Sequence, residues 1–364
     1  MKRLWQDLTR KDRIRTRGPV LAAIVAAAAL VLGGAALLLS SSGGGKAPPL
    51  AAPTTTTGSS GSSGGPSSPS SPPTGSGRGA GTTVAGGGSK LRTDTKPVPL
   101  TACVASPHTC GYPDATTTGV PAGTSLTAGG SMTVTTAGAV IDGMDISGSI
   151  SVRADNVTIQ NSRIICGDGC SGRFTINVPS GVTGLTVRDV EAGGVSSVGA
   201  VIGGGGPVTV LRANLHGGVD GVHVVSGSEV RDSYIHDQSP TDTSHDDAIQ
   251  QIPSQADHVT IVHNTLIPYN LGMHVFNNSA YICGSQCTAT TNMTFTDNLL
   301  DGGSHTLQCP DRGTAGNVFA RNRFGHNFRF GAITKACTAT GNQFDASSNV
   351  FDDTRKPVIS APKG

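Results

Sequence analysis

The sequence predicts an all-β fold, a right-handed parallel β-helix solenoid of about nine coils, and three observations predict it. Beyond residue 138, short segments of alternating apolar and polar residues recur about every 26 residues. The two-residue alternation, together with abundant Gly, Thr, Val and Asn, excludes helices. Strands that recur once per coil stack in parallel and bury their alternate side chains. The alternative is a β-sandwich, which needs hairpin turns about every 8 to 12 residues and has no internal period.

The repeat places a polar residue at an equivalent corner of each coil. Asparagine suits such a corner because it tolerates left-handed backbone and because its amide can bond to the coils above and below. The expected corner positions are Asn161, Asp189, Arg212, Asp232, Asn264, Asn298, Asn322 and Asn342.

The chain before residue 101 divides into three parts of different composition. Residues 1–18 hold seven basic and two acidic residues, and we expect them in the cytoplasm. Residues 19–40 include twenty consecutive uncharged residues, the length of a helix that crosses a bilayer. We therefore expect an uncleaved, single-pass signal anchor in the cell membrane; a cleavable signal peptide, the alternative, usually has a shorter apolar region. Residues 41–100 are rich in Gly, Ser, Thr and Pro, which predicts a disordered linker.

The folded part is expected to comprise residues 101–364 and to lie outside the cell as a monomer. The chain has a net charge of +2, but the basic residues gather before residue 18, so the remainder is mildly acidic. A mildly acidic chain has no broad basic field, and we expect no nucleic-acid partner.

All eight cysteines lie beyond the predicted membrane segment, which predicts disulfides. A zinc site is the alternative, but the sequence contains no Cys-x-x-Cys pair. Proximity in sequence suggests three pairs and leaves one: Cys103 with Cys110, Cys166 with Cys170, Cys283 with Cys287, and Cys309 with Cys337.

Aligned strands predict a ladder of polar side chains on one outer face. Five segments have the inward members Val222, Ile249, Met273, Leu307 and Phe328. Their outward neighbours are His223, Gln250, His274, Gln308 and Arg329. Two His, two Gln and an Arg in register are typical of a surface that binds hydroxyls or carboxylates, and we interpret the first four as substrate-binding residues. The alternative is a face that is polar only because it is solvated.

Three features resemble the secreted right-handed β-helix proteins of actinobacteria, distant relatives of the pectate-lyase-like superfamily: the opening segment CGYPDATTTGVPAGTSLT, coils of the form xVTIxNxxI, and the segment SHDDAIQ. The resemblance covers about residues 103–345 and implies a β-helix that acts on or binds polysaccharide. The family's recurring form is His-x-Asp-Gly-x-Gln, which His245, Asp247 and Gln250 match, while Ala248 replaces the glycine. The calcium-site and arginine motifs of pectate lyases are not found.

The segment with His245 and Asp247 lies in one of two coils that are longer than the others, and insertions in solenoids often form a binding face. A neighbouring carboxylate, from Asp246, Asp247 or Asp220, can orient the His245 imidazole as a general base. The same aspartates suit a calcium ion, the one cofactor that the sequence suggests. A loop histidine that caps backbone carbonyls is the alternative for His245.

Two functions from different classes remain open. The first is an enzyme that acts on an acidic polysaccharide as a lyase, hydrolase or epimerase. In elimination, His245 removes a proton while Arg329 or Arg323 offsets the charge of a uronate. In hydrolysis, Asp220 and Asp247 are the paired carboxyl groups. The second function is non-catalytic glycan binding or spacing at the cell surface, which the tether favours.

The aromatic content indicates how a glycan would be recognised. The only tryptophan is Trp5, before the predicted membrane segment. Few aromatic side chains are therefore available for stacking, among them Tyr234, Tyr269, Phe276 and Tyr281. We expect hydrogen bonds to dominate recognition, as suits a charged or heavily hydroxylated glycan.

Overall fold

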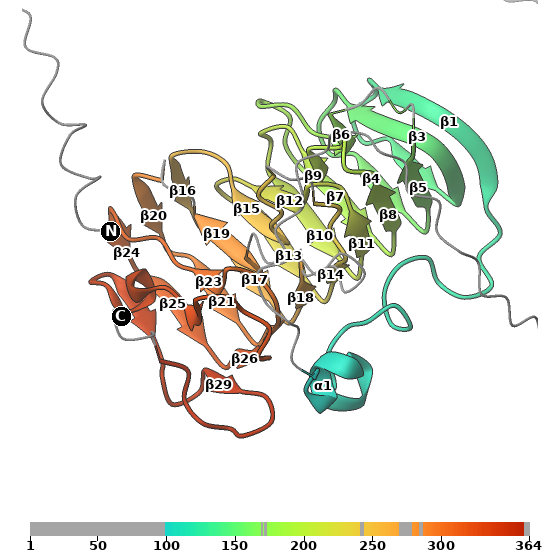
Figure 1. Ribbon diagram of the computed structural model, residues 1–364. Helices are drawn as coiled ribbons and strands as arrows, with labels where there is room; N and C mark the ends of the chain where they lie inside the picture. The colour runs from blue at the N-terminus through green and yellow to red at the C-terminus, as the bar shows by residue number, and fades with distance from the viewer. Residues whose placement is uncertain are drawn as a thin grey trace, which may run out of the picture. The chain divides into compact units, whose positions relative to one another are not determined.

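A computed structural model describes residues 99–168, 170, 173–240, 244–268, 279–283 and 287–359. These residues form stacked parallel strands and very little helix, which confirms the predicted all-β parallel solenoid (Figure 1). The predicted cytoplasmic segment, the predicted membrane span at 19–40 and nearly all of the predicted linker lie outside the described residues. Within the described ranges, no helix is long and apolar enough to span a bilayer.

One sheet has a single strand from each coil, and all of its strands pair in parallel. Its nine strands are β2 (Val140–Asp142), β4 (Thr158–Gln160), β7 (Leu185–Arg188), β10 (Val208–Leu211), β13 (Glu229–Arg231), β17 (Thr260–Val262), β21 (Thr294–Thr296), β25 (Asn317–Ala320) and β28 (Asn342–Phe344). A three-stranded sheet adds β16 (Gln255–Asp257), β20 (Ala289–Thr291) and β24 (Thr314–Ala315).

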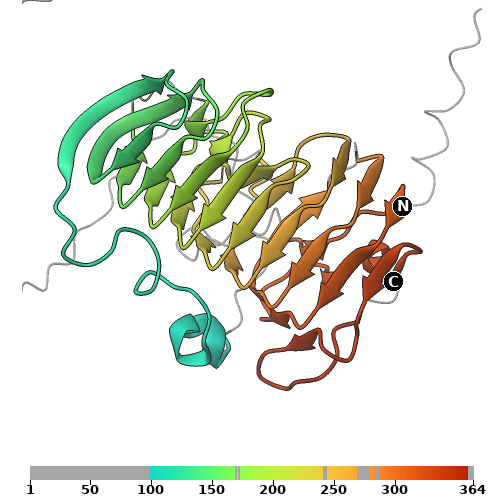
Figure 2. The same cartoon turned by 180° about the vertical axis from the view of Figure 1, so that it is seen from behind.

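The second large sheet has seventeen strands in two parallel rows that share the long strand β3 (Met144–Val152). The first row continues from β3 through β5 (Arg163–Cys166), β8 (Glu191–Gly194), β11 (Asn214–Gly217), β14 (Tyr234–His236), β18 (Thr265–Ile267), β22 (Leu299–Leu300), β26 (Arg323–Phe324) and β29 (Val350–Phe351). The second row contains β1 (Thr127–Val134), β3, β6 (Phe174–Asn177), β9 (Ala200–Gly203), β12 (Asp220–Val224), β15 (Ile249–Gln251), β19 (Tyr281–Cys283), β23 (His305–Gln308) and β27 (Gly331–Ile333). Figures 1 and 2 show successive coils side by side in sequence order.

The core is a stack of inward side chains, one level per coil. In the nine-stranded sheet the stacked inward residues are Ile141, Ile159, Val187, Val210, Val230, Ile261, Phe295, Phe319 and Phe344. The stack therefore changes from aliphatic to aromatic along the chain, and the Phe295 and Phe319 ring centroids lie 5.9 Å apart. Burial of this continuous apolar column is the main stabilising contribution.

At the corner between the nine-stranded sheet and the first row, the predicted corner residues are correct in the earlier coils and displaced in the later ones. Left-handed backbone occurs at Asn161, Asp189, Arg212 and Asp232 as predicted, and then at His263, Asp297 and Arg321. The predicted Asn264, Asn298 and Asn322 each follow a left-handed residue by one position, and Asn342 lies in β28, paired with Asn317. The sequence analysis expected one corner residue to adopt left-handed backbone and to bond to the neighbouring coils. In the later coils two adjacent residues divide these functions: the first is left-handed and the second bonds between coils.

The second of these positions carries a buried asparagine ladder, formed by Asn264, Asn298, Asn322 and Asn349. The Asn298 side-chain oxygen accepts hydrogen bonds from the Asn264 N–H, at 2.9 Å, and from the Asn264 side-chain amide, at 3.0 Å. The Asn298 amide in turn donates to the Ile261 carbonyl and to the Asn322 side-chain oxygen. Each amide is thus both donor and acceptor between coils.

A strap, residues 99–126, crosses the coils at this corner and includes helix α1 (Ala102–Ala105) and a 3₁₀ helix (Pro107–Cys110). The Cys103 N–H donates to the Asp352 carboxylate, near β29. Further along the strap, Gly111 accepts from His263, and the Gly119 N–H donates to the Arg212 carbonyl. The strap therefore connects the last coils to the earlier ones.

The four predicted disulfides are confirmed. They join Cys103 to Cys110, Cys166 to Cys170, Cys283 to Cys287 and Cys309 to Cys337. The last bond links residues 28 apart in sequence whose α-carbons lie 4.8 Å apart, as expected for adjacent coils.

Candidate active site

Four coils of the second row place polar residues at one register position at or just before the strand. Because Val222, Ile249, Tyr281 and Leu307 are aligned, the residues two positions earlier are aligned too. These are Asp220, Asp247, Ser279 and His305, which we call the polar column. The Asp247 N–H donates to Asp220 Oδ1 at 2.9 Å, and the Ser279 N–H donates to Asp247 Oδ1 at 2.8 Å. The Ser279 hydroxyl donates to the His305 carbonyl, which completes the chain of contacts.

Asp247 is the most unusual member of the polar column. Its side chain is 1% exposed, and its Oδ2 atom is buried without a hydrogen-bond partner among the described residues. Burial, followed by the negative charge of Asp220, raises the pKa of Asp247 well above its ordinary value; the Ser279 N–H opposes this and Asp246 adds to it. Asp247 is therefore a protonated acid at pH values where an ordinary aspartate is ionised.

Asp220 is held in a hydrogen-bonded pair with His223. The His223 Nε2 and Asp220 Oδ2 atoms lie 2.8 Å apart, and both side chains are largely buried. The imidazole contacts the Phe174 ring edge to face, and a side-chain carbon on Gly203 would lie 2.6 Å from that ring. Gly203 thus makes room for Phe174 and His223, which fixes the imidazole against Asp220. The predicted residues Asp220, Asp247 and His223 are brought together.

The predicted outward ladder is correct in part. Gln250 pairs in register with His223, and the next two positions are Ile282 and Gln308. The Gln308 amide donates to Ser279 at 2.6 Å, so this residue contacts the polar column.

Two assignments to the ladder were wrong. The position given to His274 belongs to Ile282, while His274 itself lies outside the described residues. In the last coil Leu307 pairs with Ile333, not with Phe328, so Arg329 does not occupy the ladder position. The Arg329 guanidinium instead lies 4.7 Å from the centroid of the Phe330 ring. The two alignments failed because short apolar segments next to the true strands have the same alternation.

The remaining predicted residues take different places. His245 is exposed, two positions before the buried Asp247. Arg323 lies 3.7 Å from the Asp352 carboxylate and over the Tyr112 ring, which is a structural role at the strap. In the part of the chain that the structure describes, no three His, Cys, Asp or Glu side chains are arranged to hold a metal ion.

Sequence reasoning missed two members of the polar column, Ser279 and His305, as parts of one site. His305 is half-buried, and burial lowers the pKa of its imidazole. The sequence signal that could have revealed Ser279 is the strand Tyr281–Cys283, because alignment of Tyr281 with Ile249 and Leu307 places Ser279 level with Asp247 and His305. Tyr281 is completely buried and donates its hydroxyl to Gln251.

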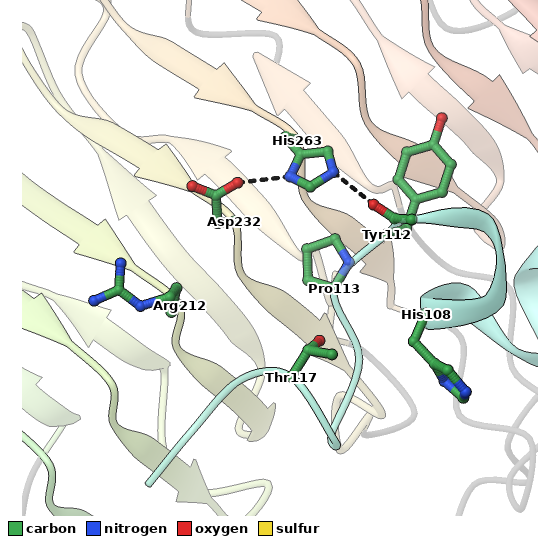
Figure 3. Close-up of a pocket in the computed structure, with 8 residues that line it drawn as sticks. His108, Tyr112, Pro113, Thr117, Arg212, Asp232 and His263 are labelled. Carbon is green, nitrogen blue, oxygen red and sulfur yellow. Dashed lines mark hydrogen bonds and ion pairs between the residues drawn. The ribbon is translucent and has the colours of Figure 1, made fainter. Parts of the chain in front are cut away.

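A separate cavity of about 340 Å³ lies between the strap and the corner of the coils (Figure 3). His263 lines this cavity, and both of its ring nitrogens have partners. Its Nδ1 lies 2.6 Å from Asp232 Oδ1, and its Nε2 lies 2.8 Å from the Gly111 carbonyl oxygen. The Arg212 guanidinium on its edge makes two 2.7 Å contacts with Asp189. Because these groups bond to one another, the cavity is better explained as the joint that fastens the strap than as a catalytic centre.

Comparisons with protein-family models, with curated proteins and with solved structures gave no match.

Proposed function

We propose that this chain is a right-handed, pectate-lyase-like β-helix protein that hydrolyses an extended polysaccharide at the polar column. The observation that carries the proposal is the buried Oδ2 of Asp247, which has no hydrogen-bond partner among the described residues and lies close to the charge of Asp220. A strongly perturbed carboxyl group beside a second carboxylate is typical of catalytic sites. Purely structural stacking gives no reason to place two acids together.

The two carboxyl groups suit the two roles that glycoside hydrolysis requires. Asp247, which is protonated, donates its proton to the glycosidic oxygen as the bond from that oxygen to the anomeric carbon breaks. Asp220, oriented by His223, is the second carboxyl group, which activates water or attacks the anomeric carbon. Water finally supplies the hydroxyl group of the new reducing end, and its other proton restores the acid.

Burial imposes a condition on this mechanism. Asp220 is 4% exposed and Asp247 is 1% exposed, so a glycosidic bond reaches them only after the covering groups move. Site opening is therefore a step of the proposed reaction, as in many enzymes that exclude water from their chemistry.

Hydrolysis has more support than elimination. Elimination requires a base next to a cation that offsets a uronate charge. The cation assigned to that role, Arg329, is not in register with the polar column, and Arg323 is engaged at the strap. The acid and the carboxylate needed for hydrolysis lie in adjacent coils.

Non-catalytic glycan binding is the second candidate, and the deep burial of both carboxyl groups favours it. The outward Gln250 and Gln308 side chains would then bind hydroxyl groups without any bond being cleaved. In either case we propose an acidic polysaccharide as the partner.

The proposed location is the outer face of a cell membrane, with the N-terminal segment inside. Four disulfides support an oxidising compartment. Protease added to intact cells with the wall removed should release the β-helix. Complete protection of the β-helix would refute this topology.

The hydrolase proposal is tested with the full chain on pectin, alginate and glycosaminoglycans. We expect new reducing ends without unsaturated products, and a loss of at least about 100-fold in Asp247→Asn and in Asp220→Asn. Asp142→Asn, which changes an exposed aspartate in the first coil, is the matched control and should keep full activity. Unsaturated products would indicate elimination instead. Glycan binding without cleavage would favour the second candidate.

A further inference from the structure

Phe330 is an exposed aromatic side chain at the end of the polar column. It is 55% exposed, and among the described residues it is the one aromatic member of the exposed large hydrophobic side chains, the others being Val140, Ile252 and Ile359. A phenyl ring left in water forgoes the stabilisation that burial of its apolar surface would give. Single exposed apolar residues are common, so the significance of Phe330 lies in its position on the solenoid.

The backbone holds Phe330 on the solenoid. Its N–H donates to the Ser304 carbonyl at 2.8 Å, and the Arg329 N–H donates to the Gly303 carbonyl at 3.1 Å. The next residue, Gly331, pairs in register with His305. The ring is therefore positioned by the parallel sheet itself.

The side chains around Phe330 connect it to the polar column. The His305 and Phe330 ring centroids lie 5.8 Å apart, and the Arg329 guanidinium lies over the Phe330 ring at 4.7 Å. His305 and Asp247 occupy the same register position two coils apart, which corresponds to roughly 10 Å at one strand spacing per coil. Phe330 belongs to the following coil, so it lies about one more strand spacing away along the same row.

We infer that Phe330 is a stacking platform for a sugar ring of the polysaccharide, several rings away from the bond that Asp247 cleaves. This inference rests on the proposed function. The carbon–hydrogen face of a sugar packs on the part of the Phe330 ring that stays exposed. Arg329, which lies over the ring, and His305, which lies beside it, offer groups that bind hydroxyls or carboxylates. The platform makes turnover depend on chain length, because only a long glycan reaches both Asp247 and Phe330.

The test compares Phe330→Ala with Phe330→Trp in the full chain. On polymeric pectin, alginate or hyaluronan, whichever the wild type degrades, we expect kcat/KM to fall about tenfold for Phe330→Ala and to be kept by Phe330→Trp. On disaccharides and trisaccharides of the same glycan, both variants should match the wild type. Val140→Ala, which removes an exposed apolar side chain from the first coil, is the control.

Binding separates the failure of this inference from that of the proposed function. Retardation of each variant in native gels that contain the same three polymers measures affinity without any chemistry. If the wild type is retarded but cleaves nothing, the hydrolase proposal fails while loss of retardation in Phe330→Ala still supports the platform. If Phe330→Ala behaves like Val140→Ala on polymers, the platform is refuted. A wild type that neither binds nor cleaves any of the polymers overturns both.

Discussion

The asparagine ladder and the polar column use the same geometry with different chemistry. In both, a side-chain oxygen of one coil accepts the N–H of the equivalent residue in the neighbouring coil, as Asn298 does for Asn264 and Asp220 does for Asp247. An asparagine also offers an N–H₂ group, which donates to further carbonyls. An aspartate leaves a second oxygen, and Oδ2 of Asp247 has no partner in the described part of the chain. From this difference we infer that stability alone would favour asparagine over Asp220 and Asp247 at these positions.

The largest expected effect comes from placing an acid in the asparagine ladder. In Asn298→Asp, an oxygen replaces the amide that donates to the Ile261 carbonyl and the Asn322 side chain. Two buried acceptors then face an acid, and we expect a loss of about 3 to 5 kcal/mol in the free energy of unfolding. Urea denaturation of the variant measures it, with the exposed Gln343→Glu as control. A loss of stability below about 1 kcal/mol would mean that the asparagine ladder tolerates an acid as well as the polar column does.

Asp301 sharpens the comparison because it is a buried acid whose oxygens are both satisfied. The Asn327 N–H and side-chain amide donate to its two oxygens at 2.9 Å, yet burial raises its pKa to about 6. A pKa raised on folding stabilises the protein below the ordinary aspartate pKa, and this stabilisation is lost as the pH rises to about 6. The shift corresponds to at most about 3 kcal/mol.

The measurement is the free energy of unfolding of the wild type and of Asp301→Asn at several pH values. The wild type should lose stability between about pH 4 and pH 6, and the variant should show a flatter profile over the same range. Equal slopes in the two proteins would assign the pH dependence to other groups.

Replacing the buried acid Asp247 of the polar column by an amide should stabilise the protein while it abolishes activity. In Asp247→Asn, an amide can take the place of the unpartnered Oδ2 and donate towards Asp220, which adds about 1 to 2 kcal/mol at neutral pH. Because the pKa of Asp247 is raised, its contribution to wild-type stability is most favourable below the ordinary aspartate pKa of about 4 and is lost as the pH rises. The advantage of the variant should therefore grow with pH.

Thermal unfolding across this pH range, with Asp142→Asn as control, checks the expected gain. A destabilised Asp247→Asn would show that the carboxyl group is structural, and the comparison with the asparagine ladder would then lose its functional meaning.

Sequence reasoning succeeded where one physical requirement dominates. Alternation and period predicted the solenoid because each coil must bury its inward side chains, and the nearest cysteines paired because short loops keep them close. The predicted strand alignment was wrong for His274 and Arg329. A three-residue strand such as β19 shows too little alternation to distinguish it from neighbouring segments with a similar pattern. Asp220 and Asp247 were identified as a pair, but their burial depends on tertiary packing that no local pattern contains.

The smallest expected effect tests whether stacked polar side chains stabilise the solenoid wherever they occur. Arg321 and Asp297 occupy the left-handed corner next to the asparagine ladder and form two contacts of 2.7 and 2.8 Å, but the arginine is mostly exposed. Solvent and salt screen such a pair, so Arg321→Ala should lose less than about 1 kcal/mol, and less still in high salt. Urea denaturation at low and high ionic strength measures both values. Arg312→Ala is the control, because Arg312 is exposed and its guanidinium lies 3.8 Å from its neighbour Asp311. A loss as large as that of Asn298→Asp would show that stacking geometry matters more than burial, and the contrast between amide and acid would no longer explain the polar column.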